Sequence, residues 1–266
     1  MKRNESRVAP IDGGRRPLRL PIWALSLVGF VSLWQLIVWA FRLPPFLVPA
    51  PSVLIHVIAS EGGLIGRHLL TTLSEAATGL AVAIPIGLGV AGLMHGSRAA
   101  REIIYPHMVL AQAIPLIALA PIVLVWFGMG ILSKILIVSF VCFFPISVNA
   151  YEGFRAVDRG YHELLVSCGA TRWQQYRHLY LPAVLPNVFA GLKLAATYCV
   201  LGAVVGEWLG GVRGMGIYMT RALQSFRNDR LFAAILVIML TSVLLFKGVD
   251  WLGNRFTPWI ERRSHG

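Results

Sequence analysis

Long apolar stretches alternate with short polar ones along this chain, in a pattern typical of a protein that crosses a membrane several times. A helix needs about twenty mainly apolar residues to span the hydrocarbon core of a bilayer. Six stretches are close to that length, so we predict an all-α polytopic membrane protein with six transmembrane helices. These spans are residues 22–41, 71–94, 104–127, 134–150, 187–208 and 231–252.

Two of the predicted spans have an unusual composition. The second is rich in glycine, at positions 79, 87, 89 and 92. Because small residues let helices approach closely in a membrane, we expect this span to pack inside the protein. The third contains Pro106, Pro115 and Pro121, which leave backbone carbonyls that neighbouring helices or a water-filled path must satisfy.

A polar segment, residues 163–182 with the sequence ELLVSCGATRWQQYRHLYLP, separates the fourth and fifth predicted spans. We expect a short helix over residues 163–168 that ends at Gly169, since glycine enters the left-handed conformation without steric cost. Thr171 and Gln174 have the spacing of a capping box and predict the start of a second helix.

The second short helix is expected to carry an aromatic ridge and to end at a proline. Trp173, Tyr176 and Tyr180 follow one another at spacings of three and four, which places their rings on one helix face. Pro182 is predicted to stop this helix, and Pro186 suits the first turn of the next one.

The same segment resembles the EAA loop of ATP-binding-cassette importer permeases, whose pattern is E-A-A-x3-G-x9-I-x-L-P. Glu163 and Gly169 match it, as does the terminal Leu181-Pro182 pair, whereas leucines replace both alanines and Leu179 replaces the isoleucine. The passage QAIPLIALAPIVLVWFGMG, in the third span, resembles the nitrate, sulfonate and taurine group of these permeases. The alternative interpretation of the segment is an ordinary amphipathic hairpin at the membrane surface.

The resemblance implies a type I importer permease fold and a set of partners. In the family this loop docks into a groove on a cytoplasmic ATPase, so two ATPase subunits, a second permease copy forming a homodimer and an extracytoplasmic substrate-binding protein are implied. The residues implied to couple to the ATPase are Glu163, Leu164, Leu165, Gly169, Ala170, Thr171, Trp173, Tyr176, Leu179, Leu181 and Pro182.

Composition and charge indicate a membrane location and an orientation. Hydrophobic residues make up 56% of the 266 residues and charged ones only 14%, and the net charge is +12. We interpret this charge as topology and contact with anionic lipid, not as nucleic-acid binding. With the amino terminus inside, the cytoplasmic side holds fifteen arginines and lysines and the opposite side seven. We therefore predict a multi-pass plasma (inner) membrane protein with cytoplasmic tails at residues 1–20 and 255–266, a permease domain at 21–254, and a cytoplasmic loop at 152–186.

No residues form a recognisable catalytic or cofactor site. His162 and Glu163 begin a zinc-protease motif, but Val166 stands where its second histidine is required, and no Gly-Lys pair exists that could form a P-loop. The three cysteines have no paired spacing and are expected to be small hydrophobic residues, not disulfides or metal ligands. We predict no enzyme activity, no bound metal and no cofactor in this subunit, with ATP used by the partner ATPase.

A few polar side chains lie within the predicted spans and are candidates to line a path. Gln112, Asn149 and Glu207 are the main candidates, although hydrogen bonding between helices is the preferred interpretation of the first two. Glu207 is expected either to pair with an arginine of the following loop or to help form an outer gate. Glu75 is expected at the membrane interface, and Lys193 is expected to snorkel towards the cytoplasm.

The nature of the solute and one alternative mechanism stay open. The group that the chain resembles includes carriers of nitrate, sulfonates, taurine, thiamine precursors and riboflavin. The passage VVGEWLGGVRGMGIYM is more similar to the thiamine-precursor and riboflavin branch. A small secondary transporter driven by an ion gradient is the alternative function; it should show paired repeats and a carboxylate near the membrane midplane.

Overall fold

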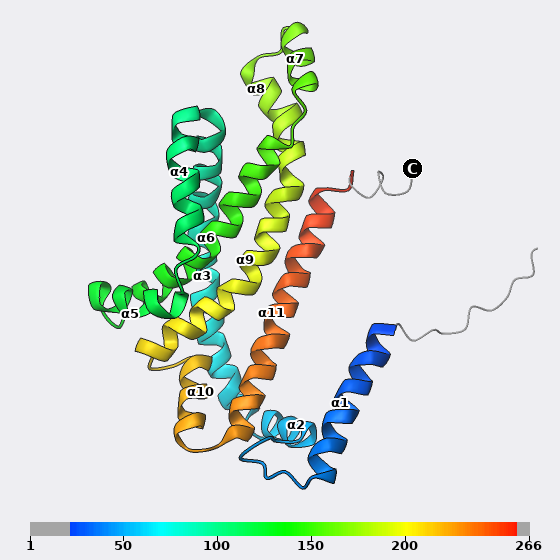
Figure 1. Ribbon diagram of the computed structural model, residues 1–266, viewed down its shortest axis with the longest axis vertical. Coiled ribbons are helices and arrows are strands. Elements are labelled where there is room, and N and C mark those ends of the chain that lie inside the picture. The colour runs from blue at the N-terminus through cyan, green and yellow to red at the C-terminus, as the bar shows by residue number, and fades with distance from the viewer. Residues whose placement is uncertain (1–21, 260–266) are drawn as a thin grey trace, which may run out of the picture.

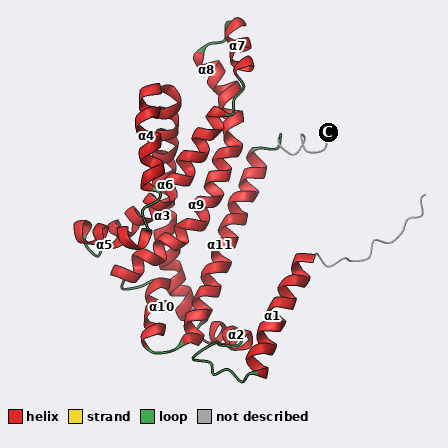
Figure 2. Cartoon of the chain, in the orientation of Figure 1, coloured by secondary structure: helices red, strands yellow, loops and turns green. Residues whose placement is uncertain are grey.

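The computed structural model describes residues 22–259, and all regular structure in that range is helical (Figures 1 and 2). The tail predicted for residues 1–20 and the end of the tail predicted for 255–266 lie outside the described residues. In chain order the elements are α1 (Ile22–Ala40), α2 (Pro51–Ser60), α3 (Gly62–Gly96), α4 (Arg98–Ala111), α5 (Leu116–Phe127), α6 (Ile131–Arg155), α7 (Arg159–Ser167), α8 (Arg172–Gln175), the π-helical segment η1 (Tyr176–Tyr180), α9 (Leu181–Gly210), α10 (Met215–Gln224) and α11 (Asn228–Phe256).

The all-helical membrane architecture is confirmed, but the described residues supply four or five candidate spans instead of six. Four helical stretches are long and apolar enough to cross a membrane: α3, α6, α11 and the run from α8 through α9. The pair α4 and α5 counts as a fifth if the two are taken as one span, although the chain bends by 103° between them. Helix α1 is apolar but shorter, and in Figure 1 it stands apart from the other long helices and meets the rest of the protein beside α2.

The third predicted span is therefore not one helix. Helix α4 ends at Ala111, and α5 begins only after Pro115, which has an extended conformation at the start of that helix. A proline also disfavours the helical conformation in the residue before it, so the helix breaks at this point. Helix α5 consequently lies crosswise to the bundle (Figure 1).

Two other predicted boundaries are wrong in the same direction, because the helices begin earlier than their apolar stretches. Helix α3 begins at Gly62 instead of residue 71, so Arg67 and His68 are helical. Helix α9 begins at Leu181 instead of residue 187, which places Pro182 and Pro186 inside it.

Helices α3 and α6 pack closely through two equivalent contacts eight residues apart. Ser139 Oγ donates a hydrogen bond to the carbonyl of Gly79 at 2.9 Å, and Ser147 Oγ donates one to the carbonyl of Gly87 at 3.0 Å. A side chain at Gly79 would overlap Val138, so glycine is required there for the approach. The prediction of an internal packing helix is confirmed at these two glycines, while nothing lies within 4 Å of where side chains at Gly89 and Gly92 would be.

Helix α9 completes the core with α3 and α6. Its small residues, among them Ala195 and Ala203, are buried against Val138 and Ile146 of α6. Cys142 and Cys199 lie in the same core as free thiols, as expected for small hydrophobic residues.

A buried ion pair also joins α3 to α6. Lys134 Nζ lies 2.6 Å from Glu75 Oε1, and only 8% and 4% of the two side chains are exposed. The expectation that Glu75 is interfacial is therefore wrong: the nine extra residues at the start of α3 move it into the helix interior, where Lys134 neutralises it. The second oxygen of this carboxylate, Oε2, has no hydrogen-bond partner among residues 22–259.

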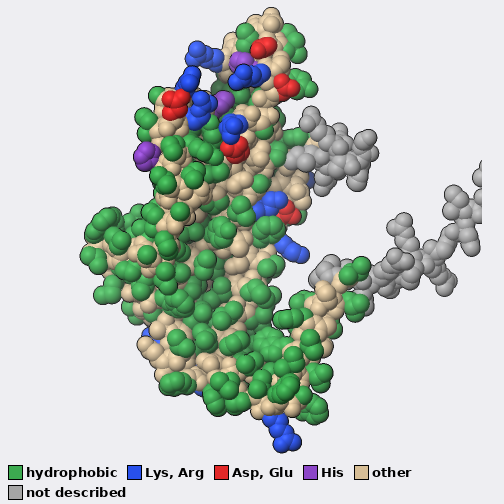
Figure 3. Space-filling model, viewed as in Figure 1, with side chains coloured by type: hydrophobic (Ala, Val, Ile, Leu, Met, Phe, Trp, Pro, Cys, Tyr) green, Lys and Arg blue, Asp and Glu red, His purple; other side chains and the backbone are tan. Residues whose placement is uncertain are grey.

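Charged side chains are distributed unevenly along the molecule. In Figure 3, lysine, arginine and acidic side chains gather over α7, α8 and the adjoining end of α4, whereas hydrophobic side chains cover the middle. An apolar band with a charged end is what a bilayer requires of a spanning bundle.

Breaking the Glu75–Lys134 pair should be costly, and replacing both partners should not be. Lys134→Met leaves a buried carboxylate without a counter-charge, so we expect it to lower the free energy of unfolding by about 3–5 kcal/mol. The double change Glu75→Leu with Lys134→Met should recover most of that loss, measured by thermal unfolding in detergent.

The exposed pair Arg98–Glu102, joined at 2.8 Å, provides the control. Arg98→Met should change the free energy of unfolding by less than about 1 kcal/mol, because surface ion pairs contribute little. A double variant at 75 and 134 that is as unstable as Lys134→Met would contradict this account.

Candidate functional site

The polar segment after α6 forms a projection at one end of the molecule (Figure 1). Asp158 caps the start of α7, where its carboxylate accepts a hydrogen bond from the amide of Gly160 at 2.8 Å. Helix α7 thus begins at Arg159, four residues before Glu163. The expectation that Glu163 stands at the start of this helix is wrong, because the Asp158 cap adds a full turn before it.

The turn between α7 and α8 is built as predicted. Gly169 has φ +75°, the left-handed conformation, and closes the helix by donating its amide hydrogen to the carbonyl of Val166 at 2.9 Å. The amide of Ala170 likewise reaches the carbonyl of Leu165 at 2.9 Å. Nothing lies within 4 Å of where a side chain at Gly169 would be. Glycine is therefore required here for its backbone conformation alone.

The predicted capping box is also present. The amide of Thr171 donates to Gln174 Oε1 at 2.8 Å, and Thr171 Oγ1 accepts from the amide of Gln174 at 3.3 Å. These reciprocal bonds satisfy two amides at the start of α8.

Pro182 does not end the second helix, contrary to the prediction. Because proline has no amide hydrogen, it cannot donate to the carbonyl four residues before it. The preceding turn widens instead into the π-helical segment η1, in which the amide of Leu181 donates to the carbonyl of Tyr176, five residues back. The chain therefore stays helical from Arg172 to Gly210.

The aromatic residues divide into two groups. Trp173 and Tyr176 stack on one another, with ring centroids 6.4 Å apart, and both are exposed. Tyr180 instead turns towards the bundle: its ring lies 4.7 Å from that of His95 at the end of α3, and its hydroxyl lies 3.2 Å from His162 Nδ1 on α7. Tyr180 thus attaches the projection to the long helices.

The projection presents an unburied surface with apolar and charged groups. No residue of α7, α8 or η1 is buried. The exposed members of the predicted set are Glu163, Leu164, Gly169, Thr171, Trp173, Tyr176 and Leu181, and the half-buried members are Leu165, Ala170, Leu179 and Pro182. Trp173 is 68% exposed and lies against the exposed ring of Tyr176, and neighbouring exposed apolar groups of this kind mark contact surfaces.

The three candidates for lining a path lie in different environments. Gln112 is exposed at the break between α4 and α5. Asn149 is half-buried and donates to the carbonyl of Pro145 at 2.7 Å. This bond lies within α6, so the expected hydrogen bond between helices is not the bond that Asn149 makes. Glu207 is fully buried, and no hydrogen bond between described residues joins it to either of the others.

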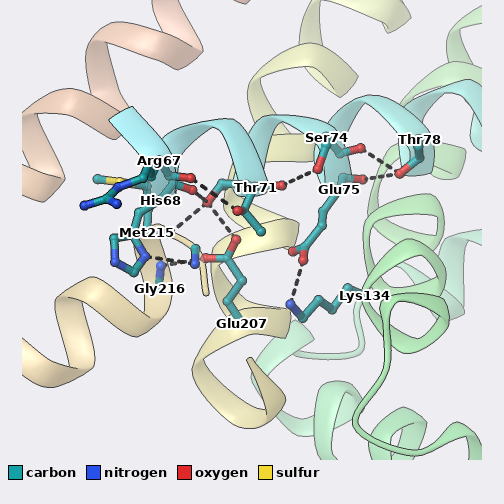
Figure 4. A network of polar contacts seen from close by, with 12 residues as sticks. Arg67, His68, Thr71, Ser74, Glu75, Thr78, Lys134, Glu207, Met215 and Gly216 are labelled. Atoms are coloured by element: carbon teal, nitrogen blue, oxygen red, sulfur yellow. Dashed lines mark hydrogen bonds and ion pairs between the residues drawn. The ribbon is translucent and has the colours of Figure 1, made fainter. Parts of the chain in front are cut away.

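Glu207 belongs to a buried group of contacts that we call the outer cluster, composed of His68, Thr72, Glu207 and the first amides of α10. Figure 4 labels His68, Glu207, Met215 and Gly216 of this cluster. Glu207 accepts hydrogen bonds from Thr72 Oγ1 and from the amide of Gly216, both at 2.6 Å. The expected pairing of Glu207 with a loop arginine is wrong, because these neutral donors occupy both of its oxygens.

The remaining donors at the start of α10 are satisfied by α3. The amide of Met215 donates to Thr72 Oγ1 at 2.8 Å, and the amide of Gly214 donates to His68 Nδ1 at 3.0 Å. Gly214 has φ +123°, and a side chain there would overlap the Glu207 carboxylate. The outer cluster therefore fixes α10 against α3 and α9 and depends on glycine at this position.

Sequence reasoning did not identify His68 and Thr72. The signal that was available is their spacing of four, followed by Glu75 after three more residues, which places three polar side chains on one face of α3. Lys193, expected to snorkel, pairs instead with Asp250 of α11 at 2.7 Å. Between residues 22 and 259 no group of three or more His, Cys, Asp or Glu side chains is placed to hold a metal ion.

Comparison with known proteins agrees with this architecture. The family described as binding-protein-dependent transport system inner membrane component matches residues 83–262. The formylaminopyrimidine transport permease protein ThiX of Halalkalibacterium halodurans is 37% identical over 82% of this chain and 88% of its own. The riboflavin transport system permease protein RibX of Chloroflexus aurantiacus is 32% identical over 91% of this chain and 90% of its own.

Solved structures share the fold at lower identity. A chain of the MetNI methionine ABC transporter, in an inward-facing conformation, superposes with a TM-score of 0.65 at 19% identity, covering 74% of this chain and 98% of that one. A chain of a bacterial ABC transporter that imports alginate gives a TM-score of 0.61 at 17% identity, covering 89% and 96%. The type I importer permease fold is thereby confirmed.

Replacing Gly169 should loosen the end of α7. Gly169→Val forces a β-branched residue into the left-handed conformation at a local cost of about 1–2 kcal/mol. Hydrogen–deuterium exchange should therefore speed up in residues 164–170. Gly169→Asn is the matched control, because asparagine tolerates this conformation, and it should exchange nearly as slowly as the unaltered chain. Equal protection in the valine variant would show that the turn does not need a left-handed residue.

Proposed function

Because the chain belongs to the family of binding-protein-dependent transport system inner membrane components, we propose that it couples solute import to a separate ATPase through the projection formed by α7, α8 and η1. Family membership makes the chain the permease subunit of an ATP-binding-cassette importer, a multi-pass inner membrane protein that is not an enzyme. It also sets aside the alternative of a secondary transporter driven by an ion gradient.

The observation that carries the proposal is the exposed projection itself. Two short helices without a buried residue stand beyond the apolar band, joined by a left-handed glycine turn and carrying the stacked pair Trp173 and Tyr176. Aromatic residues and arginine are enriched at protein interfaces, and the projection exposes Trp173 and Tyr176 beside Arg172 and Arg177. We assign this surface to the ATPase groove, with Glu163 placed to meet a basic residue there.

The contacts of the projection provide a route from the ATPase to the path. Helix α8 continues through η1 into α9 without a break, so a displacement of α8 is carried into the fifth span. Tyr180 contacts His95 of α3 and lies 6.3 Å from Phe154 of α6. Closure of the ATPases would thus move three long helices together and switch the path between its inward- and outward-facing forms.

The proposed assembly is a homodimer of this permease with two cytoplasmic ATPases and an extracytoplasmic binding protein. Six spans per copy follow if α1 and the bent pair α4–α5 both cross the membrane. Both termini and residues 152–186 then lie in the cytoplasm, and residues 21–254 form the permease domain. The charge gathered around α7 and α8 in Figure 3 supports this orientation.

For the solute we propose a small heterocyclic compound of the formylaminopyrimidine or riboflavin kind. The support is the higher identity to ThiX and RibX, 37% and 32%, than to the taurine transport system permease protein TauC of Escherichia coli, which is 28% identical over 92% of this chain and 90% of its own. Growth of a deletion strain on each solute class, with and without the restored gene, tests this assignment. Restored growth on taurine alone would reject it.

The orientation predicts which positions an impermeant thiol reagent reaches. In a Cys168→Ser background, which removes the exposed cysteine, Gln174→Cys should not be labelled in intact spheroplasts but should be labelled once they are lysed. Val212→Cys, in the exposed turn between α9 and α10, is the control and should be labelled from outside. Labelling of Gln174→Cys before lysis would place the projection outside and overturn the proposal.

The docking role predicts a large effect of Glu163→Gln. Glu163 lies in the second turn of α7. The helix dipole stabilises a negative charge in the first turn by about 0.3–1 kcal/mol and has a smaller effect in the second turn. Loss of a desolvated charge pair with the ATPase would instead cost about 2–5 kcal/mol of association or coupling. We therefore expect less ATPase to co-purify, or hydrolysis without uptake.

Glu152→Gln is the matched control for this change. Glu152 pairs with Arg155 at 3.0 Å in an exposed position near the end of α6, so its removal should alter co-purification little. Unchanged association together with unchanged uptake per ATP in Glu163→Gln would reject the docking role.

A further inference from the structure

A cleft of about 490 Å³ opens between the first turns of α3 and α10, at the end of the molecule opposite the projection (Figure 1). Three arginines line it, Arg67 from α3 and Arg213 and Arg221 from the turn before α10 and from α10 itself, and no acidic residue does. Arg67 lies directly beside His68 of the outer cluster in Figure 4. The cleft is therefore strongly cationic.

The positive charge of the cleft is not neutralised by the rest of the described chain. The side chains of Arg67 and Arg213 make no hydrogen bond or ion pair within residues 22–259, and Arg221 makes only a 3.4 Å contact with the carbonyl of Val212. Three guanidinium groups gathered without a counter-charge repel one another unless an anion joins them.

The carboxylates at the same end of the molecule are already occupied. Glu61 accepts from Arg230, at 2.6 Å, and from the hydroxyl of Tyr218, at 2.9 Å. Burial, reinforced by Glu61, raises the pKa of Tyr218, so its hydroxyl stays a donor to that carboxylate. Asp229 pairs with Arg227 at 2.7 Å. Arg227 and Arg230 are thus paired with carboxylates, whereas the three cleft arginines, and Arg42 in the turn after α1, have no carboxylate partner among residues 22–259.

The wall of the cleft adds a fixed donor. His68 is 7% exposed, and its Nδ1 accepts the amide hydrogen of Gly214. In the neutral ring the proton must then lie on Nε2, which makes His68 a hydrogen-bond donor in the wall of the cleft. Its orientation is held by the outer cluster, so this donor is in place before any ligand arrives.

The position of the cleft relative to a bilayer indicates where its anion comes from. Helix α3 has 35 residues, about 50 Å at 1.5 Å per residue, whereas the hydrocarbon core is about 30 Å thick. The predicted span of this helix begins only at residue 71, so a hydrocarbon core that contains the span leaves the first two turns of α3, with Arg67, at the level of the lipid headgroups. Leu70, 69% exposed, lines the same cleft and offers an apolar surface one turn deeper.

We propose that this cleft binds the phosphate of an anionic phospholipid headgroup, with the acyl chain lying along Leu70. Planar guanidinium groups match the oxygens of a phosphate in paired hydrogen bonds, and His68 Nε2 supplies a further donor. Because the ligand would contact α3 and α10 together, its binding would stabilise the packing of α10 against α3, which the outer cluster already holds in place. The proposal does not depend on the identity of the solute or on the ATPase contact.

The test compares purified full-length protein in two kinds of nanodisc, one of phosphatidylcholine and one of phosphatidylcholine with phosphatidylglycerol. Native mass spectrometry counts the phosphatidylglycerol that is retained, and thermal unfolding reports its effect on stability. The unaltered protein should retain this lipid selectively and unfold at a higher temperature with it. Arg67→Gln with Arg213→Gln should reduce the selectivity by about tenfold or more, because two arginine contacts are lost.

Two further variants make the result specific. Arg42→Gln with Arg227→Gln removes the same charge outside the cleft and should keep the selectivity. Leu70→Glu leaves every arginine in place but puts a carboxylate at the mouth of the cleft, so it should exclude the lipid without disturbing the fold. Equal retention in all four proteins would overturn the proposal.

Inorganic sulfate distinguishes the two sources of an oxyanion. If millimolar sulfate stabilises the unaltered protein in phosphatidylcholine as much as phosphatidylglycerol does, and the arginine variant does not respond, the cleft takes a free anion and the lipid assignment is wrong. If sulfate has no effect while phosphatidylglycerol does, the lipid assignment holds. If the arginine variant responds to both anions as the unaltered protein does, the cleft does not hold the anion and the proposal fails.

Discussion

Polar groups enclosed between apolar helices must find partners inside the protein, and the contacts around Glu75 and Glu207 follow from that requirement. Water is absent from the core of a bundle in a bilayer, and an unpaired carboxylate there is costly. Glu75 is neutralised by Lys134, and Glu207 receives a hydroxyl and an amide hydrogen. These contacts fix the relative positions of α3, α6, α9 and α10. The close packing at Gly79 and Gly87 is in register with these contacts.

Features set by neighbouring residues could be predicted from the sequence, and features set by distant ones could not. The capping box at Thr171 and the left-handed Gly169 depend on residues within four positions, so spacing alone identifies them. The burial of Glu75 depends on Lys134, 59 residues away, and the binding of Glu207 depends on Thr72, 135 residues away. Pro182 was ambiguous because a proline can either end a helix or widen the turn before it. The apolar residues that follow Pro182 favour a continued helix, so here the preceding turn widens.

The two ends of the permease are connected by one helical run. Residues from Arg172 to Gly210 begin in the projection that we assign to the ATPase and end beside Glu207 in the outer cluster. A rigid element of this length transmits a displacement over the whole width of a membrane without a separate relay. The glycines that follow it allow the chain to turn back and place the amide of Gly216, in the first turn of α10, on that same carboxylate.

The π-helical segment lets the chain hold one extra residue without turning the part that precedes it. Each residue of an α-helix advances the chain by about 100° around its axis, whereas a π turn covers nearly the same rotation with one residue more than the α turn it replaces. Removing one residue from Tyr176–Tyr180 would therefore restore a regular helix and leave α8 at nearly the same angle about the axis of α9. Removing a residue from a regular turn of α9 would instead rotate α8, and with it the Trp173 and Tyr176 rings, by roughly 100°. The wide turn therefore tolerates a change in chain length that the regular turns do not, and such a change leaves the exposed face of the projection where it is.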